Sequence, residues 1–222
     1  MIKLYSYFRS SAAYRVRIAL NWKGLSYDYL PIHLLRNGGE QLAAEYRAVN
    51  PAGLVPAFID DRDDGDVQCD PFQQSLAIIE YLEETHPTPP LLPERPVDRA
   101  YVRGVALQIA CDVHPVNNLR VLKYLKHELS ADDAQREAWY QHWIADGFAT
   151  LEARFAKDAR TGQFVFGDTP TIADMCLVPQ VFNARRMKTD LSPYPTLVRI
   201  ADHAASLDAF GRAAPDCQPD SE

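Results

Sequence analysis

The residues best suited to chemistry stand near the start of the chain, in the run Arg9-Ser10-Ser11. Residues 2–8 are largely apolar and favour a buried strand, and from Ala12 apolar residues recur at helical spacing. This polar run therefore forms an elbow between a strand and a helix. Backbone N–H groups and the positive end of the helix dipole stabilise an anion there, and a thiolate is an anion. Either serine is also a natural N-cap, and the residues alone leave capping as the alternative to catalysis.

A second polar pair opens a helix further along the chain. Gln74 and Ser75 precede apolar residues at helical spacing, so Ser75 stands at a helix N-terminus that suits a carboxylate. Between the two pairs, residues 50–56 (NPAGLVP) hold two prolines. They indicate a rigid turn before a strand at residues 57–59.

Three arginines are candidates for binding an anionic substrate. Arg9 adjoins the elbow, Arg120 follows a helix break expected at Pro115, and Arg186 ends a later helix. Guanidinium groups bind carboxylates well, whereas a surface salt bridge is the alternative role for each of them. His114, beside the break, is expected to make a local hydrogen bond rather than to act as a general base.

The elements that must position these residues divide the chain into two parts. Residues 1–86 are predicted to fold in the order βαβαββα, with one strand at Val67–Cys69, which is typical of a thioredoxin-like α/β domain. Residues 87–97 are rich in proline and predict a stiff interdomain linker. Residues 98–222 show helical periodicity and predict an all-α domain.

The end of the chain carries two further expectations. Thr171 and Asp174 form a pattern like a capping box at the start of a buried helix, and we interpret both as structural. A last helix is predicted at Val198–Phe210, and the polar tail at residues 215–222 is expected to be loose.

Composition excludes several classes of protein. The 222 residues carry a formal net charge of −7, which argues against a nucleic-acid partner. The sequence has no apolar run of membrane-spanning length and shows no signal peptide at its start. The four cysteines include no CxxC pair, so we expect neither a metal site nor a disulfide, and a cytoplasmic location.

Several motifs together resemble the zeta class of the glutathione S-transferase family. They run in order along nearly the whole chain, as SSAAYRVRIAL, NPAGLVPAF, QQSLAIIEYLEE, TPPLLP, DTPTIADMCLVPQV and DLSPYP. The resemblance implies glutathione S-transferase architecture, glutathione as cofactor and a homodimer. It also implies that the Val55–Pro56 bond is cis. The sequence departs from the family at Ala12, where many zeta-class members have cysteine.

The resemblance also assigns roles in holding glutathione. Ser10 is expected to activate the thiol, with Ser11 in support. The backbone of Val55, before Pro56, pairs with the cysteinyl part, and Gln74 and Ser75 hold the γ-glutamyl end. The glycyl end is assigned to three further residues, which are Gln41, Asn117 and His114. Where Asn117 stands the family has the longer glutamine.

The reaction implied by the resemblance is the conversion of maleylacetoacetate to fumarylacetoacetate in tyrosine and phenylalanine breakdown. It proceeds by reversible addition of the glutathione thiolate to the double bond, with Arg9, Arg120 and Arg186 binding the anionic maleyl diketo acid. Three alternatives stay open, which are isomerisation of maleylpyruvate, a general glutathione transferase or dehalogenase activity, and a binding module without turnover. The sequence does not separate the two isomerase substrates.

Overall fold

The structure is a computed structural model that describes residues 1–61 and 70–222. By its contacts the chain forms two compact units. The first unit is Met1–Pro90 together with Leu207–Glu222, and the second is Leu91–Ser206. The last segment thus groups with the first unit, whereas the sequence predicts it as part of the helical domain. The domain ranges 1–86 and 98–222, joined by a linker, stay a prediction.

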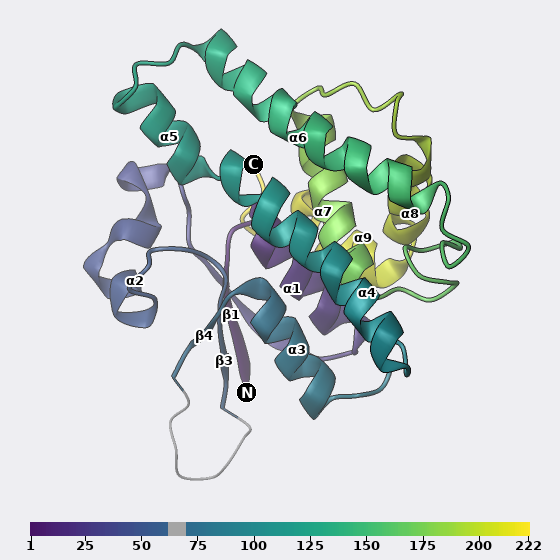
Figure 1. Ribbon diagram of the computed structural model, residues 1–222. Helices are drawn as coiled ribbons and strands as arrows, with labels where there is room; N and C mark the ends of the chain where they lie inside the picture. Colours follow the sequence, from purple (N-terminus) through teal and green to yellow (C-terminus); the bar gives the residue numbers. More distant parts are fainter. Residues whose placement is uncertain (62–69) are drawn as a thin grey trace. The chain divides into compact units, whose positions relative to one another are not determined.

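The first unit is an α/β fold around a four-stranded sheet (Figure 1). Its elements are β1 (Ile2–Ser6), α1 (Ser11–Trp22), β2 (Tyr27–Pro31), the 3₁₀ turns η1 (Arg36–Gly38) and η2 (Glu40–Leu42), α2 (Ala44–Val49), β3 (Ala57–Asp60), β4 (Phe72–Gln73), α3 (Ser75–Thr85), α9 (Asp208–Ala213) and η5 (Pro215–Cys217). This order confirms the predicted βαβαββα arrangement. The strand predicted at Val67–Cys69 lies outside the described residues, and β4 follows it.

The order of the strands in the sheet is β2-β1-β3-β4. β1 is parallel to β2, β3 is antiparallel to β1, and β4 is antiparallel to β3. Tyr5 on β1 lies opposite Ala57 at the start of β3, and Ala57 lies opposite Gln73 at the end of β4. The end of β1, the start of β3 and the end of β4 therefore meet at one edge of the sheet.

Helices cover both faces of this sheet. α1 packs against α3 and α9, and Figure 1 shows α2 on the other side of the strands from α1 and α3. A small apolar cluster lies where the three strand ends meet, and it consists of Tyr7, Phe8, Tyr46, Val55 and Ala57. Aromatic packing in this cluster therefore holds the loops that end at this edge of the sheet.

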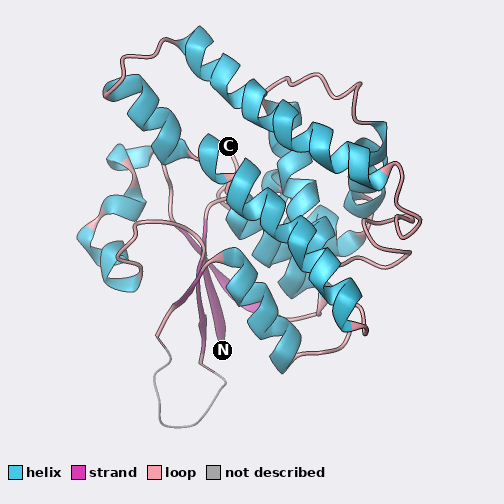
Figure 2. Cartoon of the chain, viewed as in Figure 1, coloured by secondary structure: helices cyan, strands magenta, loops and turns pink. Residues whose placement is uncertain are grey.

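The second unit is helical, and the strands drawn in Figure 2 all belong to the first unit. Its elements are α4 (Pro96–Leu107), η3 (Gln108–Val113), η4 (Pro115–Asn117), α5 (Leu119–His127), α6 (Asp133–Phe155), α7 (Ile172–Arg186) and α8 (Pro195–Ala205). The helix break expected at Pro115 is confirmed: η3 is a π-helix, η4 is a 3₁₀ turn, and Asn118 caps the new helix α5. No helix among the described residues is long and apolar enough to cross a membrane.

The start of α7 confirms the predicted capping box. The Asp174 carboxylate accepts hydrogen bonds from the N–H of Thr171 at 2.8 Å and from its Oγ1 at 2.9 Å. It also accepts the N–H of Val165 at 2.8 Å, so a single carboxylate fixes both the helix start and the loop before it. Asp174 is 0% exposed, and burial raises its pKa to about 6 against the opposite effect of these hydrogen bonds.

Two predictions for the end of the chain are wrong. The single helix expected at Val198–Phe210 is divided into α8 and α9, because Leu207 adopts an extended conformation and the Ser206 hydroxyl bonds the carbonyl of His203 at 2.7 Å. The tail expected to be loose is anchored instead. The Gln218 side chain is buried and donates to two main-chain carbonyls of the first unit.

Candidate active site

The elbow between β1 and α1 has the geometry of a capped helix start. Ser10 is the N-cap of α1, with extended backbone, and its Oγ accepts the N–H of Ala13 at 3.2 Å. Ser11 is the first helical residue and is buried, so the capping role belongs to Ser10. A hydroxyl that accepts one hydrogen bond still has its own proton to donate. Capping is therefore compatible at Ser10 with the predicted stabilisation of an anion.

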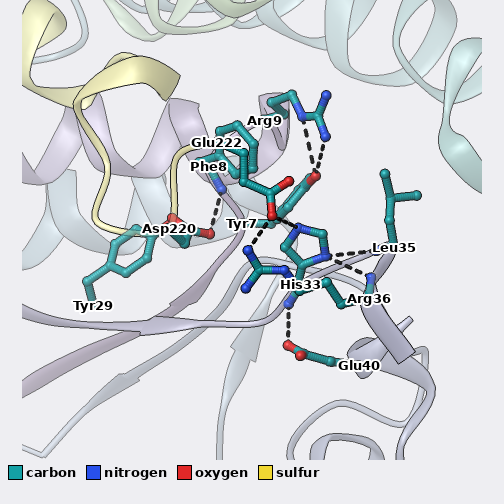
Figure 3. Close-up of polar contacts among 10 residues, drawn as sticks. All are labelled: Tyr7, Phe8, Arg9, Tyr29, His33, Leu35, Arg36, Glu40, Asp220 and Glu222. Atoms are coloured by element: carbon teal, nitrogen blue, oxygen red, sulfur yellow. Dashed lines mark hydrogen bonds and ion pairs between the residues drawn. The ribbon is translucent and has the colours of Figure 1, made fainter. Parts of the chain in front are cut away.

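Arg9 is held beside this elbow by aromatic side chains. Its guanidinium donates from Nη2 to the Tyr7 hydroxyl at 2.9 Å and lies 4.8 Å from the centroid of the Phe8 ring (Figure 3). The Tyr7 ring in turn meets the ring of His33 edge-on, at a centroid separation of 4.9 Å. The first turn of α1, residues 11–14, carries no charged side chain. Arg9 and the positive end of α1 are therefore two positive groups at this point.

The Val55–Pro56 bond is cis, which confirms the expectation from the family resemblance. The carbonyl of Leu54, just before it, accepts the Tyr46 hydroxyl at 2.6 Å and the Asn50 side-chain amide at 2.7 Å. Asn50 also accepts the N–H of Ala52 at 3.0 Å. Tyr46 and Asn50 thus hold the loop that presents Val55. Sequence analysis missed both of them, although an asparagine directly before a proline at a turn was a usable signal.

Gln74 and Ser75 lie at the same edge of the sheet, directly after β4. Gln74 has a positive φ of 69°. Residues other than glycine rarely adopt this backbone conformation, and it is concentrated at functional sites. Ser75 is the first residue of α3 and is buried, and its Oγ accepts a hydrogen bond from Nη1 of Arg15 at 3.2 Å. Arg15 lies on α1, so this contact ties the start of α3 to the helix of the elbow.

Gln41 belongs to the neighbouring loop and is also buried. The side-chain amide of Gln41 packs so tightly on Gly39 that a Cβ on Gly39 would lie 2.7 Å from Nε2. The main-chain carbonyl oxygen of Gln41 would lie 3.0 Å from a Cβ on Gly53. Gly39 and Gly53 both have positive φ, so glycine is required twice over at these positions. Oε1 of Gln41 has no hydrogen-bond partner among the described residues. A buried acceptor of this kind is suited to a ligand that donates.

In the second unit, Tyr140 of α6 connects two of the predicted residues. Asn117 is buried and donates from Nδ2 to the Tyr140 carbonyl at 3.1 Å, while its Oδ1 has no partner in the described part of the chain. Burial raises the pKa of Tyr140, and a hydrogen bond from Arg186 acts in the opposite direction. Arg186 and Arg120 are both exposed, whereas His114 is half-buried at the end of η3.

A separate cavity of about 590 Å³ lies in the second unit. Leu107, Cys111, Trp143 and Gly147 are among the residues that line it, and none of its lining residues is a predicted site residue. In the described residues there is no group of three or more His, Cys, Asp or Glu side chains placed to hold a metal ion.

Comparison with known proteins places this geometry in a family. The family described as glutathione S-transferase, N-terminal domain, matches residues 4–90, and its C-terminal domain matches residues 133–203. The fold superposes with a TM-score of 0.92 on the holo structure of a maleylpyruvate isomerase described as a bacterial zeta-class glutathione S-transferase. That protein is 47% identical, and the match covers 99% of this chain and 100% of the other. The chain belongs to the zeta class of the glutathione S-transferases.

Two further relatives of this zeta-class chain are named maleylacetoacetate isomerase. A probable maleylacetoacetate isomerase of Vibrio cholerae is 50% identical over 98% of this chain and 97% of its own length. A maleylacetoacetate isomerase of Methylobacterium extorquens AM1, solved with bound malonate and glutathione, is 39% identical. Its TM-score is 0.92, with 99% of each chain covered.

The edge of the sheet where β1, β3 and β4 meet is therefore the candidate active site of this zeta-class chain. The structure brings Ser10, Ser11 and Arg9 to that edge, together with the pairs Val55–Pro56 and Gln74–Ser75. Gln41 lies beside the same loop through its contact with Gly53. The roles of these residues, and those of the second unit's His114, Asn117, Arg120 and Arg186, stay proposals.

Proposed function

We propose that this protein is a glutathione-dependent cis–trans isomerase that converts maleylacetoacetate to fumarylacetoacetate. The observation that carries the proposal is the meeting of three segments at one edge of the sheet, at Ser10, Val55–Pro56 and Gln74–Ser75. The names of the relatives supply the substrate class. We further propose a cytoplasmic homodimer that acts in tyrosine and phenylalanine breakdown.

The residues at this edge fit glutathione by their chemistry. The start of α3, with the Ser75 hydroxyl, suits the γ-glutamyl carboxylate, and the backbone of Val55 suits the peptide groups in the middle of the molecule. The unpartnered Oε1 of the buried Gln41 suits an N–H donor near the glycyl end. Asn117 and His114 are proposed to contact the glycyl end of glutathione as well. When bound, glutathione supplies a thiol that, once ionised, is the nucleophile of the reaction.

Ser10 is proposed to keep that thiol ionised. A free cysteine thiol has a pKa of about 8.5, so it needs stabilisation as the thiolate near neutral pH. The Ser10 hydroxyl accepts the N–H of Ala13, and its own proton is proposed to bond the thiolate at the positive end of α1. Ser11 supports the start of the helix. Arg9 is proposed to bind a substrate carboxylate or the developing negative charge, and Arg120 and Arg186 to bind the far end of the substrate.

Substitutions of Ser10 test this role separately from its capping role. In Ser10→Ala, kcat/KM is expected to fall about a hundredfold, the effect of losing one donor to a developing anion. Ser10→Asp keeps a good N-cap and hence the stability of α1, but its charge repels a thiolate, so activity is expected to fall at least as far. The exposed Ser26→Ala is the control. Full activity in Ser10→Asp would contradict the proposal.

The substrate itself is tested with purified protein, by the loss of maleylacetone, as a surrogate for maleylacetoacetate, and of maleylpyruvate. The second candidate function is isomerisation of maleylpyruvate, which the 47% identical maleylpyruvate isomerase favours. Turnover of either substrate is expected only with glutathione, and the preferred substrate decides between them. Glutathione binding without turnover of either would leave a general transferase, a dehalogenase or a binding module.

A further inference from the structure

The segment that follows α9 (residues 214–222) belongs to the first unit and folds back toward its β1–α1 elbow. Gln218 anchors it through Nε2, which donates to the carbonyls of Arg212 and Ala214 at 2.8 Å each. Beyond this anchor, Asp220 and Glu222 turn toward the elbow of the candidate site (Figure 3). More than two hundred residues of sequence separate Asp220 from Ser10, so only tertiary structure brings the two regions close.

Asp220 bonds the elbow directly. One carboxylate oxygen, Oδ2, accepts the backbone N–H of Phe8 at 3.1 Å, and the other, Oδ1, accepts the Tyr29 hydroxyl at 2.6 Å. β1 ends at Ser6, whose carbonyl takes the last ladder bond from Ile32. The Phe8 N–H lies past that ladder, and the carboxylate of Asp220 is its acceptor. Phe8 is two residues before Ser10.

The backbone carbonyl of Phe8 is held as well. Arg17, on α1, is 0% exposed, and its Nη2 donates to the Phe8 carbonyl at 2.9 Å. Its Nη1 bonds the Ser6 hydroxyl at 3.1 Å, and its Nε bonds the carbonyl of Ala213 at 3.0 Å. Burial lowers the pKa of Arg17, and the neighbouring hydroxyl groups of Tyr29, Tyr27 and Tyr14 counteract that effect, with a smaller contribution from Asp220. The elbow is thus held between a buried cation and an anion.

A second contact pair, at Glu222, lies nearer to solvent. Its carboxylate pairs with Arg36 and lies 3.5 Å from Nε2 of His33, the residue whose ring meets Tyr7. Both Glu222 and Arg36 are largely exposed, so this pair contributes little. Of the two carboxylates, Asp220 is the half-buried one and bonds the elbow itself.

We propose that Asp220 is a positioning residue for the reaction: it fixes the turn from Phe8 to Ser10, so that the Ser10 hydroxyl is aimed at the thiolate of glutathione. This inference rests on the proposed role of Ser10. It predicts that the C-terminal segment contributes to cofactor activation although it lies outside the elbow. Ser10 reaches the turn through its N–H, which donates to the Tyr7 carbonyl at 2.9 Å, so a loosened Phe8 displaces Ser10 too.

The test compares Asp220→Ala and Asp220→Asn with Asp216→Ala, an exposed acid of the same segment. The first readout is amide hydrogen exchange in residues 7–11 of the protein without glutathione. In Asp220→Ala this exchange is expected to speed up about tenfold or more, the effect of losing a hydrogen bond to a charged acceptor. Asp220→Asn keeps one acceptor oxygen and is expected to lie between Asp220→Ala and the wild type. Asp216→Ala is expected to match the wild type.

The second readout is the pKa of the bound glutathione thiol, from the ultraviolet absorbance of the thiolate across a pH series. Asp220→Ala is expected to raise it by about half a unit or more, which is roughly a threefold smaller ionisation constant of the thiol. Unchanged exchange at residues 7–11 would overturn the inference. Faster exchange with an unchanged thiol pKa would overturn it too, because Asp220 would then be structural only.

These readouts also separate the inference from the proposed function. If both respond while the wild-type protein turns over no maleyl substrate, the isomerase proposal fails and the positioning role stands. If the wild type binds no glutathione, both fail. Tyr29→Phe gives a further check, since it removes the other bond to Asp220 and is expected to shift both readouts in the same direction by a smaller amount.

Discussion

The buried capping box of α7 makes a quantitative prediction about stability. Asp174 is 0% exposed and accepts hydrogen bonds from the backbone N–H groups of Val165 and Thr171, both at 2.8 Å. Asp174→Ala leaves these two buried donors without this acceptor, and each such loss costs about 1–3 kcal/mol. Removing the carboxylate also removes its own desolvation cost, which acts in the opposite direction. We therefore expect a net destabilisation of about 3 kcal/mol.

The chain offers an exposed counterpart at the start of α6. Asp132 is the N-cap of a capping box there, in the place that Thr171 takes in α7, and its exposed side chain accepts the N–H of Gln135 at 2.8 Å. Water replaces the lost acceptor in Asp132→Ala, so the expected cost is about 1 kcal/mol. The comparison therefore sets one exposed capping bond against the three hydrogen bonds of the buried Asp174, whose loss is expected to cost more.

The assay is urea unfolding followed by tryptophan fluorescence, because Trp139 and Trp143 lie on α6 in the same unit as Asp174. With an m-value of about 2 kcal/mol/M, a loss of about 3 kcal/mol lowers the midpoint by about 1.5 M. Circular dichroism on the same samples checks that one transition is being followed. If Asp174→Ala lowers the midpoint no more than Asp132→Ala does, the reasoning from burial is wrong.

Three further outcomes are expected. In Gly147→Ala the new Cβ would lie 2.3 Å from the nearest side-chain atom of η3, so the free energy of unfolding is expected to fall by about 1–3 kcal/mol. Gly104→Ala, with open space around it, is expected to raise the free energy of unfolding by about 0.5–1 kcal/mol. Thermal unfolding of both variants checks the contrast, and equal shifts in the midpoint would contradict it. Lys23→Met removes the cation of the buried Lys23–Glu83 pair, whose atoms lie 2.8 Å apart, and is expected to cost about 3–5 kcal/mol in a urea titration, a cost that a solvent-exposed pair would not show. Burial raises the pKa of Asp174 to about 6 from 3.8, so between these pH values the folded protein binds this proton more tightly than the unfolded chain does. The contribution of Asp174 to the free energy of unfolding therefore falls as the pH rises from about 4 to 6, by at most about 3 kcal/mol. Unfolding measured across that range should show this slope in the wild type and a smaller one in Asp174→Asn.

Local pattern was enough to predict much of the first unit. The alternation from apolar strand to capped helix predicted the elbow at Ser10, and the two prolines after Asn50 predicted the turn before β3. The motif resemblance predicted the cis bond at Val55–Pro56, and the capping box at Thr171 followed from residue spacing alone. These features depend on residues close in sequence, whose propensities and hydrogen bonds act within a turn or two.

Other features depend on contacts between distant residues and had no local signal. Residues 198–210 have a continuous helical pattern, yet the chain breaks at Leu207, because the residues after it pack against α1 instead of extending α8. The polar tail looked like a solvated end, yet Asp220 binds Phe8. A carboxylate in a polar tail is ordinary in sequence, and its partner is a backbone N–H, which no residue type announces.

The amino-acid sequence therefore determined the family, the order of elements in the first unit and the residues proposed for chemistry. Only the tertiary structure decided what holds those residues in place, which is Arg17 and Asp220 at the elbow, with Tyr46 and Asn50 behind Val55. The physical reason is that short-range propensities choose the local conformation. The free energy that fixes a buried loop comes instead from partners whose position exists only once the chain has folded.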